Sequence, residues 1–456
     1  MALQFHSTNH DSRKVEFSEA LLKGLAPDKG LFTPDKYPRM SIEEIRDMVS
    51  LDYPEVGFTV LSRLIGDQLP PRTLRTITRD AYNFPVPLDF VVEDRHVLRL
   101  DKGPTASFKD FAARTMARLM QYFLQEKGGE LLILTATSGD TGGAVASAFH
   151  GVDRIKVTVL FPENEVSDRQ RKQMTTLGGN VTAIAIDGKF DDCQALVKQA
   201  FADPDLAGLS LSSANSINVG RLLPQSVYYF WAFLRVNENR IQASNEHEPL
   251  VISVPSGNFG NLMGGLIAKQ LGLPVRKFIA AVNANDEFPV FLNTGRYQKV
   301  EPSRKALSNA MNVGHPSNLA RIVDLYGGIM DHEGKVSKQP DMEMMRSDLY
   351  SVSIDDETTR KVIHRVNQEH GYILEPHGAV GWAGIDSFVQ ETGNSGPFVS
   401  FETADPAKFP ILIREIVGIN PDMPRILREM QDKPEQFERI PREYASFKQF
   451  LLKKFS

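Results

Sequence analysis

The stretch from Leu131 to Phe161, LLILTATSGDTGGAVASAFHGVDRIKVTVLF, decides the fold. The segment Gly143–His150 has the length of one crossover helix. It lies between two runs of apolar and β-branched residues, Leu131–Thr135 and Lys156–Phe161. A strand, a helix and a second strand in this order favour a parallel βαβ unit. The glycine-rich turn after the first strand lies where ligands of parallel sheets bind, at the carboxyl ends of the strands.

The same alternation continues along the chain. Further strands are predicted at Val181–Ile186, Leu250–Val254, Lys277–Val282 and Phe398–Phe401, and further crossover helices at Val166–Leu177 and Asp191–Phe201. This pattern is typical of a doubly wound α/β architecture. The polar segment Asn237–Glu248 is interpreted as a connector between two such units. The first 90 residues contain helical patterns around Ser18–Lys23 and Ile42–Ser50 and few strand signals. We therefore predict an N-terminal cap (1–90), a smaller α/β domain (91–236) and a larger α/β domain (237–456).

Composition limits the classes of function. With 456 residues, 41% hydrophobic and 24% charged, the chain is long enough for more than one packed unit. A net charge of −5 gives no electrostatic reason to expect nucleic acid or an anionic membrane as partner. No apolar run reaches the ~20 residues of a membrane span, and no export signal is visible. The single cysteine, Cys193, excludes an internal disulfide and favours a cytoplasmic location. The ten histidines show no metal-ligand spacing, so no metal is predicted.

Lys109 is the candidate nucleophile. It lies in Gly-Pro-Thr-Ala-Ser-Phe-Lys-Asp (103–110), a turn that leads into an amphipathic helix predicted to end near Gly128. A lysine in the first helical turn lies at the positive end of the helix dipole, which lowers its pKa from roughly 10.4. A partly neutral amine can attack a carbonyl to form a Schiff base. The alternative is a solvated lysine at a helix end.

Three polar clusters are candidate anion sites. Two are glycine-rich strand-to-helix turns, at 135–143 and 255–261, whose N–H groups can bind an oxyanion. Neither matches a P-loop or a dinucleotide fingerprint, and glycine in such turns can serve only to bend the chain. The third cluster is Ser212–Arg221, in which Arg221 is suited to phosphate. Its alternative is an N-cap cluster with a solvated arginine.

The order of these motifs resembles the threonine synthase family in its long microbial form. Besides the Lys109 turn, the chain carries Ser-Gly-Asp-Thr-Gly (138–142), Gln-Met-Thr-Thr-Leu-Gly (173–178), Asn-Ser-Ile-Asn (215–218) and Pro-Ser-Gly-Asn-Phe-Gly-Asn (255–261). The resemblance runs nearly end to end, from Gly-Leu-Ala-Pro-Asp (24–28) to Glu-Pro-His-Gly-Ala-Val-Gly (375–381). It implies the fold-type II pyridoxal-phosphate architecture of the tryptophan synthase β-subunit, with pyridoxal 5′-phosphate as cofactor.

The resemblance also implies a set of site residues. Lys109 would be the Schiff-base lysine, Phe108 a neighbour of the cofactor ring and Thr403 the hydroxyl that faces the ring nitrogen. The cofactor phosphate would be held by Ser256, Gly257, Asn258, Phe259, Gly260 and Asn261. The substrate α-carboxylate would be held by Ser138, Gly139, Asp140 and Thr141, with the Asp140 side chain directed at the cofactor's phenolic oxygen or the substrate amine. The substrate phosphate would be held by Asn215, Ser216, Asn218 and Arg221, assisted by Lys102 and Thr105.

The implied reaction converts O-phospho-L-homoserine and water into L-threonine and inorganic phosphate, with Lys109 moving the protons. Two alternatives stay open: a phospho-lyase or dehydratase that releases 2-oxobutyrate, and a non-catalytic ligand-sensing paralogue. Three positions depart from the usual family pattern: Lys102 and Asp405 stand where the family has histidine, and Gly378 stands where it has threonine. The sequence leaves open whether the protein is a monomer or a homodimer.

Overall fold

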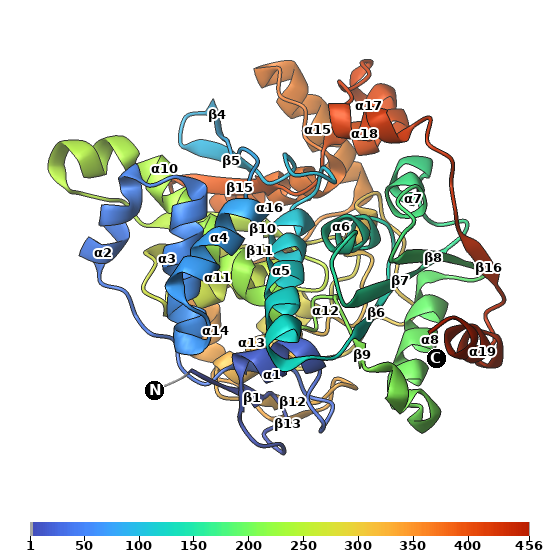
Figure 1. The fold of residues 1–456 in the computed structure, drawn as a ribbon. Coiled ribbons are helices and arrows are strands. Elements are labelled where there is room, and N and C mark those ends of the chain that lie inside the picture. The colour runs from blue at the N-terminus through green and yellow to red at the C-terminus, as the bar shows by residue number, and fades with distance from the viewer. Residues whose placement is uncertain (1–2, 456) are drawn as a thin grey trace.

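The larger of two α/β sheets forms the centre of the molecule in the computed structural model, which describes residues 3–455 (Figure 1). Its strand order is β14-β11-β10-β15-β5-β4, and each neighbouring pair is parallel except β4 and β5. The bounds are β4 Leu88–Val92, β5 Arg95–Arg99, β10 Leu250–Pro255, β11 Val275–Val282, β14 Leu349–Ser353 and β15 Phe398–Glu402. The three strands predicted here, β10, β11 and β15, are confirmed.

The smaller sheet is entirely parallel, in the order β16-β8-β7-β6-β9. Its bounds are β6 Leu131–Ala136, β7 Ile155–Pro162, β8 Val181–Ile186, β9 Leu211–Ser212 and β16 Glu438–Ile440. The connecting helices α6 (Asp140–Phe149), α7 (Asp168–Thr175) and α8 (Phe190–Ala202) follow the predicted pattern. The prediction of two doubly wound α/β units is therefore confirmed.

Helices cover both faces of the larger sheet. Along β10, Ile252 and Val254 pack in the core that includes α11, whereas Val251 packs on the opposite face with Ile385 and Phe388 of α16. This alternation is expected for a strand that is buried on both sides. The helices between residues 227 and 392 are α10 Val227–Ser244, α11 Gly260–Gln270, α12 Glu287–Thr294, α13 Leu319–Leu325, α14 Met342–Asp348, α15 Asp356–His370 and α16 Pro376–Thr392.

The N-terminal cap contains a sheet that its sequence did not predict. Strands β1 (Gln4–Ser7), β2 (Val15–Glu16) and β3 (Phe32–Pro34) form a small antiparallel sheet. They are too short to give a periodic signal of their own. The cap helices are α1 Phe17–Lys23, α2 Ile42–Asp47, α3 Tyr53–Ile65 and α4 Pro71–Ala81. Of these, α1 and α2 correspond to the two helical patterns seen in the sequence.

The connector predicted at Asn237–Glu248 is wrong for most of its length, because α10 continues to Ser244 and ends at Asn245 in a left-handed conformation (φ 56°). Ile241 and Asn237 are buried, whereas Asn239, Arg240, Gln242 and Ser244 are exposed, so this segment is one face of an amphipathic helix rather than a loop. Before α10, a 3₁₀ turn at Leu223–Ser226 surrounds Pro224, which cannot donate a helical hydrogen bond.

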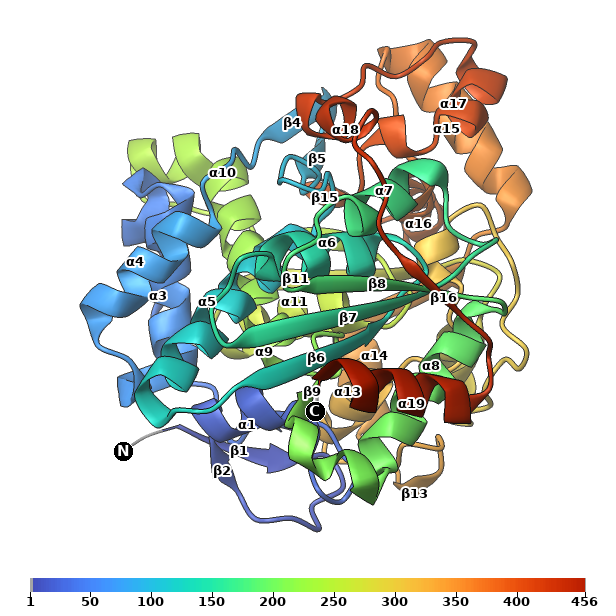
Figure 2. The ribbon, with the colours of Figure 1, turned by 45° about the vertical axis from the view of Figure 1, so that its right-hand side comes forward.

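The chain crosses between the two halves more than once. Strands β4 and β5 belong to the larger sheet, and β16 returns from the C-terminal region to the edge of the smaller one. From α17 (Pro410–Val417) and α18 (Arg425–Met430) the chain runs across to β16 and then to α19 (Tyr444–Phe455), which packs on α8 (Figure 2). The domain boundaries at 90 and 236 stay a prediction, and the strand pairing crosses both of them.

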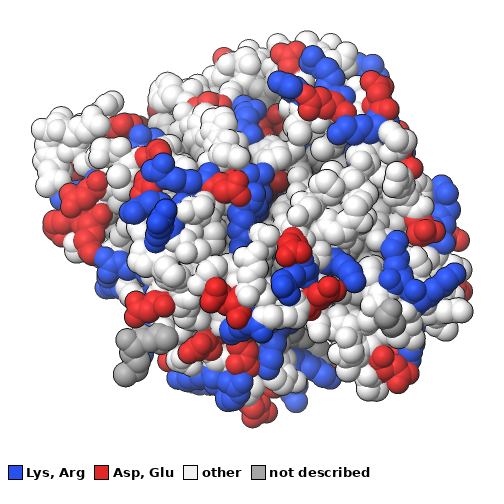
Figure 3. Space-filling view, in the orientation of Figure 1, with Lys and Arg blue, Asp and Glu red and all other residues white. Residues whose placement is uncertain are grey.

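Charged side chains of both signs are interspersed over the face seen in Figure 3. Within residues 3–455, no helix is both long enough and apolar enough to cross a membrane.

Candidate active site

Lys109 is the first residue of α5 (Lys109–Lys127), the helix that leads from β5 of the larger sheet to β6 of the smaller one. The preceding turn is held against the end of β15: the Phe108 N–H donates to the Thr403 carbonyl (2.9 Å), and the Asp405 N–H donates to the Ala106 carbonyl (3.1 Å). Ala106 has a positive φ of 53°, which reverses the chain just before the helix. Two segments far apart in the sequence thus place Lys109 and Thr403 side by side.

Burial lowers the pKa of the Lys109 amine to about 8. The Asp140 carboxylate acts in the opposite direction, while the cations of Lys408 and Arg221 lower the pKa further. The amine lies 4.7 Å from the centre of the Phe108 ring. The predicted direction of the pKa shift agrees with the structure, although burial rather than the helix dipole is the main cause.

Thr105 closes the turn internally. Its N–H and hydroxyl donate to the two carboxylate oxygens of Asp110, at 2.8 and 2.6 Å, and all of these groups are buried. Gln173 donates to the Thr105 carbonyl at 2.9 Å. Thr105 therefore shapes the Lys109 turn, and its hydroxyl is already used.

The turn after β6 exposes N–H groups at the start of α6. The hydroxyl oxygen of Thr137 accepts from the N–H groups of Gly139 (2.9 Å) and Gly142 (2.8 Å). Gly139 has φ 137°, and a Cβ there would lie 2.5 Å from the Gln170 side chain, so glycine is required. Ser138 and Thr141 are partly exposed on this turn.

The Asp140 side chain forms a buried ion pair that the sequence reasoning missed. Its Oδ1 accepts from the Lys408 amine (2.9 Å) and from the Gln170 amide (3.1 Å). Despite burial, Lys408, Lys109 and Gln170 hold the pKa of Asp140 well below its usual value. Lys408, whose 3₁₀ turn (Pro406–Lys408) follows Thr403, thus holds one oxygen of Asp140, and the orientation of Asp140 toward cofactor or substrate stays a prediction.

The turn after β10 has the features of an oxyanion cradle. Phe259 adopts a left-handed conformation (φ 57°) immediately before α11. Over the part of the chain that is described, the N–H groups from Gly257 to Asn261 have no hydrogen-bond acceptor, whereas that of Ser256 donates to the Ala281 carbonyl at 2.8 Å. A Cβ at Gly257 would lie 2.7 Å from the Cα of Met311, so only glycine fits there.

Two asparagine side chains of this turn bind protein groups. Asn258 donates to the Ser216 hydroxyl (2.7 Å) and accepts from the Ser317 N–H (2.6 Å), which joins two predicted anion sites. The side-chain oxygen Oδ1 of Asn261 accepts from the hydroxyls of Tyr228 and Tyr229, at 2.7 and 2.8 Å. The Asn261 side chain thus faces the aromatic residues of α10.

Arg221 is buried, which contradicts the alternative of a solvated arginine. One guanidinium N–H donates to the Ala214 carbonyl (2.8 Å), and the buried Nε has no hydrogen-bond partner among the described residues. Burial lowers the pKa of Arg221 to about 10. By contrast, Asn218 is a capping residue: its side chain bonds the Gly220 N–H and the carbonyls of Leu21 and Ser213. Asn215 and Ser216 are partly exposed beside them.

Arg321 of α13 connects this region to the cap and was also missed from sequence. Its guanidinium is fully buried and donates to the carbonyls of Phe32, Ser216 and Ile217 at 2.6 to 3.0 Å. It also donates to Asn318, whose amide reaches the Asn258 carbonyl at 3.0 Å. No motif of the sequence pointed to Arg321.

The Thr403 hydroxyl donates to the Glu375 carboxylate (3.1 Å), a partner that the sequence reasoning did not identify. Glu375 caps α16 by accepting the N–H groups of His377 (2.8 Å) and Gly378 (2.9 Å), and it binds the His377 ring at 2.5 Å. Because its hydrogen is used in this way, Thr403 presents oxygen lone pairs to any further partner.

Lys102 lies at the edge of the site and binds carboxylates. Its amine is 2.9 Å from Asp101 and 3.5 Å from Asp405. The predicted phosphate contact of Lys102 would have to compete with both.

Known proteins resemble this chain over its full length. The profile for "Pyridoxal-phosphate dependent enzyme" matches residues 96–399, "Threonine synthase N terminus" matches 4–82, and "Threonine synthase, C-terminal" matches 378–451. Threonine synthase of Escherichia coli K12 is 40% identical over 452 residues, which cover 99% of each chain. The chain belongs to the threonine synthase family.

Solved structures of this family have the same fold. The pyridoxal-phosphate-bound threonine synthase from Brucella melitensis superimposes with a TM-score of 0.89 at 34% identity, and the Escherichia coli threonine synthase with 0.87 at 38%. Each alignment covers 99% of both chains. As a member of this family the protein is a pyridoxal-phosphate-dependent lyase, and the cofactor prediction is confirmed.

The residues present fit this cofactor. The uncommitted N–H groups from Gly257 to Asn261 suit a phosphate, and the partly neutral Lys109 amine suits an aldehyde. The buried Arg221 Nε, which lacks a partner in the described structure, leaves capacity for a second anion.

Proposed function

We propose that this protein is a threonine synthase that converts O-phospho-L-homoserine and water into L-threonine and inorganic phosphate. The observation that carries the proposal is the buried Lys109, whose pKa is lowered to about 8 and is affected by Asp140 of one glycine-rich turn and by the buried Arg221, in a protein whose other glycine-rich turn has N–H groups, from Gly257 to Asn261, that are free within the described residues. Such a site offers one nucleophilic amine and places for several anionic groups. A phosphorylated amino acid and a phosphorylated cofactor together require that combination.

Lys109 would hold the cofactor, and the turn Ser256–Asn261 would hold its phosphate through backbone N–H groups, with Phe108 and Thr403 beside the ring. Pyridoxal phosphate, when bound, supplies an electron sink that makes the protons on the substrate's Cα and Cβ removable. The Thr403–Glu375 contact supports a hydrogen-bond acceptor, rather than a donor, at position 403.

The substrate would lie between the two remaining anion sites. Its α-carboxylate fits the turn Ser138–Thr141, where the N–H groups of Ser138, Asp140 and Thr141 have no acceptor in the described structure, whereas that of Gly139 donates to Thr137. Its phosphate fits Arg221 with Asn215 and Ser216, because Arg221 is buried and lacks a carboxylate partner in the described chain. The support for Asn218, Thr105 and Lys102 is weaker, since the hydrogen-bonding groups of each already bind protein.

Lys109 would also move protons. With a pKa of about 8, roughly one amine in ten is neutral at pH 7, so the side chain can accept a proton from carbon and return it. The Asp140–Lys408 pair contributes a fixed dipole beside this amine. Arg221 would position the departing phosphate, and the polar turn at 138–141 would leave room for the water that adds to Cβ.

The test is a product assay with O-phospho-L-homoserine and purified, cofactor-loaded enzyme. We expect equal amounts of threonine and inorganic phosphate, and no 2-oxobutyrate beyond a trace. Lys109→Ala should keep the fold, lose the visible absorbance of the bound cofactor and lose turnover. As a matched control, Lys453→Ala changes an exposed lysine of α19 and should leave both unchanged. Release of 2-oxobutyrate as the main product would assign the protein to the dehydratase alternative, and binding without turnover would assign it to the ligand-sensing one.

We also infer a cytoplasmic location, supported by the single, buried cysteine Cys193.

A further inference from the structure

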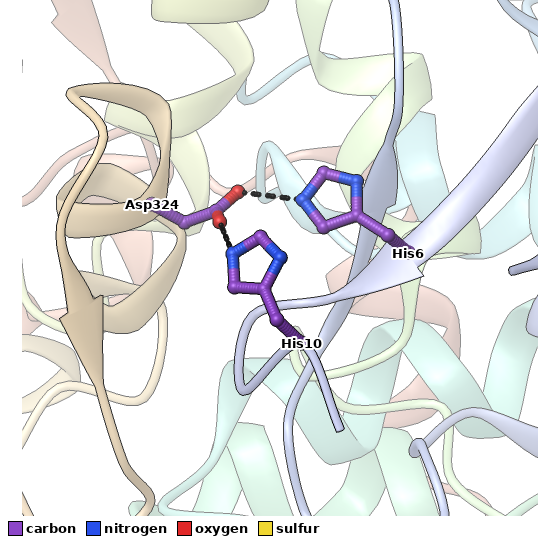
Figure 4. A group of neighbouring side chains, drawn as sticks. All are labelled: His6, His10 and Asp324. Atoms are coloured by element: carbon purple, nitrogen blue, oxygen red, sulfur yellow. Dashed lines mark hydrogen bonds and ion pairs between the residues drawn. The ribbon is translucent and has the colours of Figure 1, made fainter. Parts of the chain in front are cut away.

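Two histidines of the N-terminal segment and one aspartate of α13 converge at the protein surface. His6 lies in β1 and His10 in the turn that follows, while Asp324 lies near the end of α13 (Figure 4). The His6 Nε2 is 3.0 Å from one carboxylate oxygen of Asp324, and the His10 Nε2 is 2.6 Å from the other. No sequence motif indicated this cluster, because the aspartate is 314 positions away from the nearer histidine.

Two imidazole nitrogens and one carboxylate oxygen are ligands that transition-metal ions bind. The three ligand atoms lie within 4.8 Å of one another. Tetrahedral zinc with bonds of about 2.0 to 2.2 Å requires separations of about 3.3 Å, which small side-chain movements would give. Two imidazoles and one carboxylate leave a fourth position for water, and the cluster borders a surface cavity of about 520 Å³. We propose that His6, His10 and Asp324 bind a divalent transition-metal ion of the zinc type.

The surroundings of His6 support this assignment. Its second ring nitrogen, Nδ1, is buried without a hydrogen-bond partner among the described residues and lies 3.6 Å from the Asp35 carboxylate. A carboxylate behind a ligating histidine is the usual outer partner in such sites, because it fixes the ring and its tautomer. Asp35 is itself held by Lys14 at 2.7 Å.

The backbone also directs the two rings together. His10 has a positive φ of 60°, uncommon for a residue other than glycine, and its N–H donates to the Ser7 carbonyl at 2.9 Å. The imidazoles consequently stack with ring centres 4.9 Å apart. Without a metal, each ring can donate its Nε2 hydrogen to one oxygen of Asp324. A single metal ion would replace both protons.

The metal would tie the N-terminal strand to the helix that supports the proposed substrate loop. Asp324 follows Arg321 by one turn of α13, and Arg321 holds the carbonyls of Ser216 and Ile217. The ion thus has a structural role that does not require it to touch the reacting atoms.

Zinc binding by the full-length, cofactor-loaded enzyme tests the proposal. After treatment with EDTA and removal of free cofactor, titration calorimetry with ZnCl₂ and metal analysis after dialysis should give one zinc ion per chain. His10→Ala is the main variant because the His10 side chain is 46% exposed, so its loss leaves no buried cavity. We expect a loss of affinity of at least about 100-fold, since even outer-partner substitutions cost about 10- to 100-fold. Asp35→Asn, which changes an outer partner, should lower the zinc affinity by about 10- to 100-fold.

His364→Ala is the matched control, because it removes an exposed histidine from α15 on another part of the molecule. It should bind zinc as the unchanged protein does, and zinc should raise the thermal midpoint of both but not that of His10→Ala. Equal zinc binding by His10→Ala and the unchanged protein would overturn the proposal. So would a midpoint of the unchanged protein that is the same with and without zinc while His10→Ala lowers it in both conditions, which would show only a histidine–aspartate ion cluster.

Discussion

The buried pair of Asp140 and Lys408 gives a stability prediction of measurable size. The exposed fractions of the two side chains are 2% and 0%, and the distance from the Lys408 amine to the Asp140 carboxylate is 2.9 Å. Lys408→Met keeps most of the side-chain volume but leaves the carboxylate buried without its cation. Removing one partner of a buried pair typically costs about 3 to 5 kcal/mol. The Gln170 amide still donates to Asp140, so we expect a loss near the lower end, about 3 kcal/mol.

Urea unfolding followed by the fluorescence of Trp231 and Trp382 measures this loss, read as a shift of the midpoint at unchanged slope. The matched control is Lys361→Met, which breaks an exposed Lys361–Glu357 pair with a similar distance of 2.6 Å. That pair spans one helical turn in solvent, so its loss should cost at most about 0.5 kcal/mol.

A double variant and the pH dependence test the cause. Asp140→Asn combined with Lys408→Met removes both charges, so it should be more stable than Lys408→Met alone. In the unchanged protein the lowered pKa of Asp140 contributes stability above pH ~4, lost only as the pH falls through the folded-state pKa. Without Lys408, burial raises that pKa, and protonation at acidic pH removes the unpaired charge. The stability gap should therefore narrow as the pH falls from 8 toward 5. A Lys408→Met variant no less stable than Lys361→Met would refute the reasoning.

Three further predictions concern Lys109, Gly378 and Arg221. In cofactor-free enzyme, the rate of pyridoxal phosphate capture should rise with pH up to about 8 and then level off, because the pKa of Lys109 is lowered to about 8. A capture rate that continues to rise through pH ~10 would indicate an ordinary lysine. Lys109→Ala measures the capture rate without this amine. A methyl group at Gly378 would lie 2.0 Å from the Glu402 carboxylate, whose other oxygen holds the Glu375 N–H, so Gly378→Ala should cost about 1 to 3 kcal/mol in urea unfolding. Gly208→Ala, with open space around it, should be near neutral, and equal midpoints for the two variants would contradict the packing argument. Arg221→Met should raise KM for O-phospho-L-homoserine about 10- to 100-fold with a smaller change in kcat, because it removes a charged hydrogen-bond donor; an unchanged KM would assign Arg221 a purely structural role.

The strands that could be predicted were those whose own residues carry the signal. β6, β7, β8, β10, β11 and β15 are runs of β-branched and apolar residues buried on both faces. The strands β5 (RHVLR) and β14 (LYSVS) mix polar with apolar residues, and β16 is only three residues long. These three exist because a neighbouring strand supplies their hydrogen bonds, and no local pattern contains that information.

The residues of the candidate site also fall into two groups: those that a local motif indicates and those that only packing brings together. Lys109 and the two glycine-rich turns are local motifs, so their residue types are enough to indicate their chemistry. Lys408 was not predicted to pair with Asp140 because the two are separated by 268 positions. Glu375 likewise belongs to a recognisable motif, yet its bond to Thr403 depends on how β15 lies beside the start of α16. The sequence predicted which turns meet, and packing alone determined which side chains bind each other.

Two departures from the family pattern make sense only as a pair. Lys102 and Asp405 each stand where the family has histidine, and taken separately each casts doubt on substrate orientation. In the structure they are in contact: the Lys102 amine lies 3.5 Å from the Asp405 carboxylate and 2.9 Å from Asp101. A lysine at 102 beside a histidine at 405 would bring two groups of like charge together whenever the ring is protonated, whereas an aspartate supplies the opposite charge. Burial raises the pKa of Asp405, and the positive charge of Lys102 lowers it again by favouring the ionised carboxylate. Each residue thus supplies the opposite charge to the other at the edge of the site. The two departures therefore meet in one ion pair, and any phosphate contact of Lys102 would have to compete with Asp405 and Asp101.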